Sequence, residues 1–91
     1  MIFIESMKKQ ARKSPGAVAF RIMQGWTFGL SLQSGDWHFS AELFPKGRGS
    51  ADTDWHYLGR VLAEVGAPEQ PITPFETTSP NAVHHWHWPK T

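Results

Sequence analysis

At 91 residues the chain has room for one domain with one core, and nine basic against eight acidic side chains leave a net charge of +1, too small to attract nucleic acid or a membrane surface over long range. The five tryptophans and the absence of cysteine indicate a core built on large aromatic side chains without disulfides, and a cysteine-free chain fits a cytoplasmic location. No stretch of the sequence approaches the ~20 apolar residues that a membrane-spanning helix needs, so we expect a soluble protein that does not enter a membrane.

Residues 1–15 form a basic N-terminal segment that carries Lys8, Lys9, Arg12 and Lys13. Within this segment the apolar residues fall three and four positions apart, which suits a short helix with a basic outer face. Residues 2–5 could instead begin a strand. Ser14-Pro15-Gly16 ends either element.

Residues 17–44 alternate between apolar and polar side chains in three runs, and this two-residue period predicts strands. Gln24-Gly25 and Ser34-Gly35 lie between the runs and suit tight two-residue turns, because glycine tolerates a positive φ. Together they predict a three-stranded antiparallel meander. We expect its apolar face to contain Phe20, Phe28 and Phe39.

The next predicted element is a helix that begins after a loop at residues 45–50. Its apolar residues, from Trp55 through Leu58 and Leu62 to Val65, recur at helical spacing, and Gly66 is suited to end it. The apolar face of the meander is the only large surface on which this stripe can pack. The predicted fold class is therefore α+β, with one helix on a three-stranded sheet.

Residues 67–91 contain five of the seven prolines, and Pro68, Pro71 and Pro74 lie three apart, the repeat of a polyproline II segment. We expect an extended strap that ends in a short edge strand at residues 82–88. The expected organisation is a single domain over residues 1–91: a basic segment (1–15), a core of three strands and one helix (16–66) and the strap (67–91).

The polar face of the predicted meander is a candidate binding surface, together with the tryptophans of the C-terminal tail. Its expected members are Arg21, Thr27, Ser31, Gln33, His38, Ser40, Trp86 and Trp88. Tryptophan that a small core cannot absorb is typical of interfaces. We therefore expect a non-catalytic interaction module whose partner is another protein or a second copy of the chain, and the sequence contains no cysteine nucleophile or Gly-x-Ser-x-Gly elbow.

Weak nucleic-acid binding is an alternative, since some plant DNA-binding domains resemble this architecture of three strands and one helix. The basic residues that would contact phosphates are Lys8, Lys9, Arg12, Lys13, Arg21, Lys46 and Arg48. Lys46 and Arg48 also precede a predicted helix N-terminus, where an anion could bind. Against this alternative, the predicted sheet face carries few basic residues, and phosphate contacts usually dominate such affinity.

The run His84-His85-Trp86-His87-Trp88 suggests a metal site as a third alternative. In a strand His85 and His87 would share one face about 7 Å apart, with His84 and the tryptophans on the other. The expected ion is zinc, held by His84, His85 and His87, with a further ligand from His38, His56 or Asp52. The simpler interpretation is that the tryptophans cover the edge of the core.

Overall fold

The computed structural model describes residues 1–43, 51–68 and 83–91, with the side chains of residues 51 and 52 outside the description. Its elements in chain order are α1 (Ile2–Lys13), β1 (Ala19–Met23), β2 (Trp26–Gln33), β3 (Asp36–Leu43), α2 (Ala51–Val65) and β4 (Val83–Pro89). Neither of the helices in these ranges is long and apolar enough to cross a membrane.

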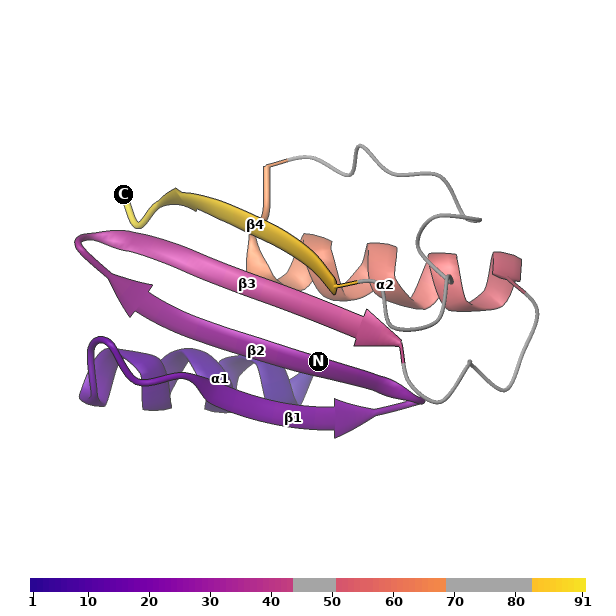
Figure 1. The fold of residues 1–91 in the computed structure, drawn as a ribbon, viewed down its shortest axis with the longest axis horizontal. Helices are drawn as coiled ribbons and strands as arrows, with labels where there is room; N and C mark the ends of the chain where they lie inside the picture. Colours follow the sequence, from indigo (N-terminus) through magenta and orange to yellow (C-terminus); the bar gives the residue numbers. More distant parts are fainter. Residues whose placement is uncertain (44–50, 69–82) are drawn as a thin grey trace.

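The strands form one antiparallel sheet in the order β1-β2-β3-β4, and both helices lie along the sheet (Figure 1). The α+β class and the central meander are confirmed. The predicted core of three strands and one helix lacks two elements that the structure has. The N-terminal segment forms the helix α1, and the tail forms a fourth strand paired with β3. The short strand predicted at the end of the strap is this β4.

Two tight turns set the register of the meander. Gln24 and Gly25 have φ of 54° and 83°, and Ser34 and Gly35 have φ of 52° and 80°. Two consecutive positive φ values are typical of the two-residue turn whose twist matches antiparallel strands. The predicted turns are therefore confirmed, and the first of them pairs Met23 with Trp26.

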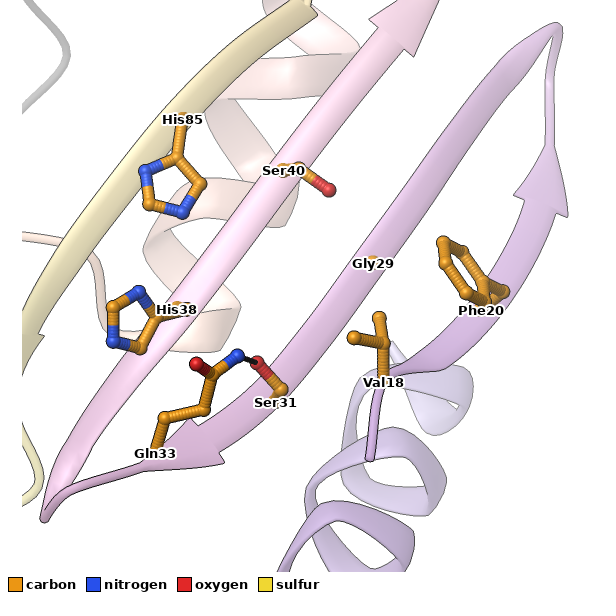
Figure 2. A pocket seen from close by; sticks show the side chains of 8 residues that line it. All are labelled: Val18, Phe20, Gly29, Ser31, Gln33, His38, Ser40 and His85. Carbon is orange, nitrogen blue, oxygen red and sulfur yellow. Dashed lines mark hydrogen bonds between the residues drawn. The ribbon is translucent and has the colours of Figure 1, made fainter. Parts of the chain in front are cut away.

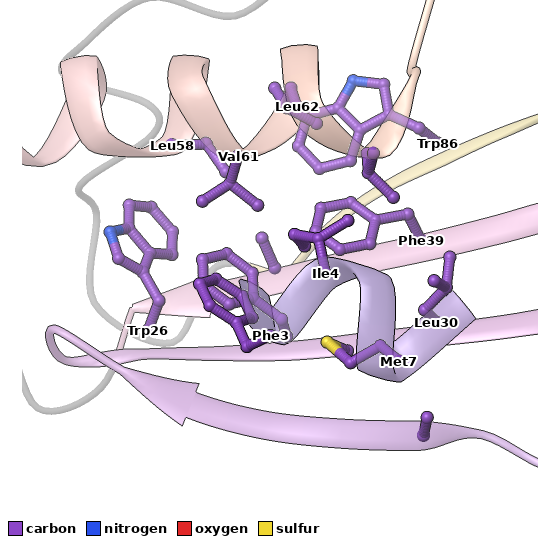
Figure 3. Close-up of a cluster of buried hydrophobic side chains, with 14 of the residues drawn as sticks. Phe3, Ile4, Met7, Trp26, Leu30, Phe39, Leu58, Val61, Leu62 and Trp86 are labelled. Atoms are coloured by element: carbon purple, nitrogen blue, oxygen red, sulfur yellow. The ribbon is translucent and has the colours of Figure 1, made fainter. Parts of the chain in front are cut away.

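The core lies between the helices and one face of the sheet, as Figure 3 shows. Phe28 is fully buried, and its ring centroid lies 6.0 Å from those of Phe3 and Trp26 and 5.6 Å from that of Phe39. Leu58 and Leu62 of α2 are buried in the same cluster, as predicted. The helix of residues 2–13 contributes a second apolar stripe, which consists of Phe3, Ile4, Met7 and Ala11.

The end of α2 agrees with the prediction at Gly66. This glycine has φ of 92°, and the N–H of the following Ala67 donates to the carbonyl oxygen of Leu62 at 3.0 Å. A hydrogen bond that spans five residues with a left-handed glycine inside it is the Schellman C-cap.

The prediction for the faces of β1 is wrong. Phe20 and Ile22 are 68% and 72% exposed, while Ala19 is 3% exposed. The register explains the difference, because directly paired residues of neighbouring strands share a face. Arg21 pairs with buried Phe28, and its guanidinium lies 5.7 Å from the ring centroid of Phe3. The expectation that Arg21 lies on the free polar face is therefore also wrong.

Two predicted segments lie outside the described residues. One is the loop that contains Lys46 and Arg48, with its anion site before α2, and the other is the polyproline II repeat at Pro71 and Pro74.

Candidate functional site

The sheet face that points away from the helices is the candidate site, and we call it the outer face. The register places Thr27, Ser31 and Gln33 of β2 and His38 and Ser40 of β3 on it, as predicted. Nε2 of Gln33 donates to Oγ of Ser31 at 2.8 Å. This bond gives one end of the face an ordered polar rim (Figure 2).

Apolar side chains form the part of the outer face at β1, and one of them is Phe20, which was predicted to lie in the core. Val18, which directly precedes β1, and Phe20 and Ile22 within β1 are all exposed. Val83 of β4 pairs with Glu42, lies on the same face and is also exposed. The outer face is therefore apolar along β1 and polar across β3 and most of β4.

A hollow of about 220 Å³ lies between these two parts. Its lining residues are Val18, Phe20, Gly29, Ser31, Gln33, His38, Ser40 and His85 (Figure 2). Gly29 keeps it open, because a Cβ there would lie 2.8 Å from Oγ of Ser40 and 3.2 Å from Cε1 of Phe20. Any side chain at this position would displace its neighbours and fill the floor of the hollow.

Three imidazoles meet on the outer face, and we call His38, His85 and His87 the histidine cluster. The ring centroid of His38 lies 5.5 Å from that of His85 and 5.6 Å from that of His87, and the last two are 6.3 Å apart. Direct pairing of His38 with His87 across β3 and β4 brings them together. Partial burial, followed by the positive charges that His38 and His87 can carry, lowers the pKa of His85.

The lowered pKa predicts how His85 titrates in the metal-free protein. Its pKa should lie below the ordinary 6.5, which NMR of the imidazole nitrogens measures directly. His38→Gln should raise this pKa part of the way back, because a neutral side chain removes one repulsive charge but leaves the burial. The unfolded chain binds this proton first, so the contribution of His85 to stability falls as the pH drops below the unfolded pKa of about 6.5. A midpoint at or above 6.5 would contradict the cause given.

The tail residues do not all share the outer face. Trp86 pairs with Phe39 and is 8% exposed, and Trp88 pairs with Trp37 and packs against the core. They therefore do not belong to the outer face, and their positions agree with the simpler interpretation that they cover the edge of the core. Both lie on the core side because alternation along β4 directs them there.

His84 lies on the core face with these tryptophans, since it pairs with buried Ala41. Its Nε2 is buried and has no hydrogen-bond partner among the described residues. The expected ligand set of His84, His85 and His87 is therefore not assembled, although His85 and His87 do share a face. In the described parts of the chain, no group of three metal-binding side chains is already arranged to hold an ion.

The nucleic-acid alternative combines the basic N-terminal residues with the outer face of the sheet, but the structure places these on different sides of the sheet. Lys8, Lys9, Arg12 and Lys13 belong to α1, which packs on the core face of the sheet. Nζ of Lys8 lies 5.8 Å from the ring centroid of Trp37 on that side. The strand residues of the outer face include no lysine or arginine, and Asp36 and Glu42 are acidic.

Sequence reasoning missed the apolar half of the outer face, although a signal was present. A two-residue turn at Gln24-Gly25 pairs Met23 with Trp26 and so directs Phe20 away from Phe28.

No family model, curated protein or solved structure matches this chain.

Proposed function

We propose that the chain is a non-catalytic interaction module whose outer face packs against the same face of a second copy. The observation that carries this proposal is the location of exposed apolar side chains. Of the five large exposed hydrophobic residues in the described ranges, all but Ile2 lie on the outer face: Val18, Phe20, Ile22 and Val83. Val18, Phe20 and Ile22 form a continuous exposed apolar strip at β1, whereas Val83 lies across the sheet on β4, and such a strip on a small domain is typical of an interaction site.

The shape of the outer face favours a second copy as the partner. The exposed side chains of Val18, Phe20 and Ile22 form a ridge along β1, and this ridge lies beside the hollow above Gly29. A two-fold axis through the face would place the ridge of each copy against the hollow of the other, the self-complementary arrangement of a symmetric dimer. Two sheets packed in this way bury their facing side chains in a layer ~10 Å thick.

The charges on the outer face are compatible with this pairing. The hollow is lined by serine, glutamine and histidine beside its apolar side chains, and the acidic Asp36 and Glu42 lie near the two ends of β3. No side chain that lines the hollow carries a fixed charge, so two copies would bring few like charges together there.

The size of the face predicts a weak dimer. Strands of five to eight residues, with a spacing of ~4.8 Å and a rise of ~3.3 Å per residue, make a face of roughly 450 Å². Two such faces would bury about 900 Å² in total, slightly below the ~1,000 Å² expected of a specific stable interface. We therefore expect association that depends on concentration in the micromolar range.

Analytical ultracentrifugation across about 1 µM to 1 mM tests this proposal. The wild-type chain should shift from monomer to dimer, and Phe20→Thr should remain monomeric, because it removes the largest side chain of the ridge and keeps a residue suited to strands. Ile2→Thr is the matched control, since Ile2 is 91% exposed away from the outer face, and it should dimerise like the wild type. A wild-type chain that is monomeric throughout, or a Phe20→Thr variant that still dimerises, would overturn the proposal.

A further inference from the structure

The structure points to a second role for the outer face, at the histidine cluster. We infer that His38, His85 and His87 together bind one divalent first-row transition metal ion of the kind that prefers imidazole, such as Zn²⁺. This inference does not depend on dimerisation, because all three ligands come from one chain. It also differs from a site formed by the histidine run alone, because it requires β3.

The spacing of the three rings is close to that of a metal site. With Zn–N distances of ~2.1 Å and tetrahedral angles, three bound imidazoles have ring centroids about 5.2 Å apart. The observed separations of 5.5, 5.6 and 6.3 Å exceed this value by about 1 Å or less. The nitrogens are not yet directed at a common point, so binding requires rotation of the rings.

Such rotation is feasible at these positions. His85 and His87 are exposed and His38 is half-buried, so their side chains are not locked by packing. The backbone beneath them is held by the ladder between β3 and β4, in which His38 pairs with His87 and Ser40 with His85. The strands therefore hold the three Cα positions in place, and only side-chain torsions have to change.

The ligand chemistry selects the class of ion. The cluster offers three imidazole nitrogens, which suit Zn²⁺, Co²⁺, Ni²⁺ and Cu²⁺, whereas Mg²⁺ and Ca²⁺ require mainly oxygen ligands. Three protein ligands leave one position for water or another small ligand. An open site on a sheet surface should bind with micromolar affinity, more weakly than closed sites with four ligands.

Titration with metal chloride salts tests the site. Isothermal titration calorimetry with Zn²⁺ should show one ion per chain, and Co²⁺ should produce the visible absorption of a tetrahedral complex. Mg²⁺ should give no heat of binding. His38→Gln and His87→Gln should each weaken Zn²⁺ binding at least about tenfold, since each removes one of three ligands.

The matched control is His84→Gln. His84 belongs to the same run of histidines but lies on the core face, so its loss should leave the affinity unchanged. His56→Gln on α2 is a second control with no change expected, in case the His84 variant fails to fold. Circular dichroism of each metal-free variant checks that it is folded.

Three results would overturn the inference. The first is no Zn²⁺ binding up to about 1 mM, well above the affinity expected of an imidazole site. The second is a His38→Gln variant that binds like the wild type while His84→Gln weakens binding, because the run would then act as a flexible peptide. The third is one ion per two chains. Repeating the titration with monomeric Phe20→Thr separates this site from the proposed dimer, since Zn²⁺ binding should persist there.

Discussion

Phe28→Ala is expected to lower the free energy of unfolding by about 3–5 kcal/mol, the range for loss of a buried phenylalanine. Phe28 is fully buried, and its ring packs between those of Phe3, Trp26 and Phe39. Little of the resulting cavity could collapse, because the surrounding rings belong to three different elements, α1, β2 and β3. A domain of this size has a total stability of roughly 5–14 kcal/mol, so this one change removes a large part of it.

Phe20→Ala is the matched control for this prediction. Phe20 is the same residue type in the neighbouring strand but is 68% exposed on the outer face, so its loss should cost less than about 1 kcal/mol, chiefly in strand propensity. Urea unfolding followed by tryptophan fluorescence, at a concentration where the chain is monomeric, measures both. Equal losses for the two variants would show that the faces of β1 and β2 are wrongly assigned.

Trp86→Ala should have a comparable effect, again about 3–5 kcal/mol. Trp86 is 8% exposed, and its ring centroid lies 6.0 Å from that of Phe39. Trp86 and Leu62 of α2 belong to the same buried cluster (Figure 3), so β4 contributes to the core that this helix also lines. Loss of the indole would open the side of the core that the C-terminal strand covers.

Val83→Thr is the control in the same strand. Val83 is 61% exposed and threonine also suits strands, so the change should cost less than about 0.5 kcal/mol. The measurement is urea unfolding with a chelator present, so that metal binding does not add to stability. If Trp86→Ala costs no more than Val83→Thr, β4 is an appendage rather than part of the core.

Much of the fold can be derived from local patterns in the sequence. Alternation along residues 26–33 and 36–43 predicts β2 and β3 with the correct buried faces, and Gly25 and Gly35 predict the turns. The helical spacing that includes Leu58 and Leu62 predicts α2, which ends at Gly66. Each of these signals lies within a few neighbouring residues, because turn geometry and side-chain period are local properties of the backbone.

The candidate site was predicted only in part, because the alternation along β1 was interpreted without the register that the Gln24-Gly25 turn sets. The pattern of β1 shows that Phe20 and Ile22 share a face, but it does not say which face another element covers. That choice depended on pairing with β2 and on α1, whose own apolar stripe covers Ala19 and places Phe3 beside Arg21. Hydrophobicity alone therefore assigned Phe20 to the core, and the apolar half of the outer face went unseen.

By itself the sequence determined that His85 and His87 share one face of a strand while His84, Trp86 and Trp88 share the other, because that alternation is a property of any extended backbone. Only the tertiary structure decided that His38 joins the first pair and that the tryptophans cover the core. The pairing of β3 with β4 joins segments more than forty residues apart in the chain. No local pattern encodes such a register, since it is selected by how well the whole sheet buries its apolar face against α1 and α2.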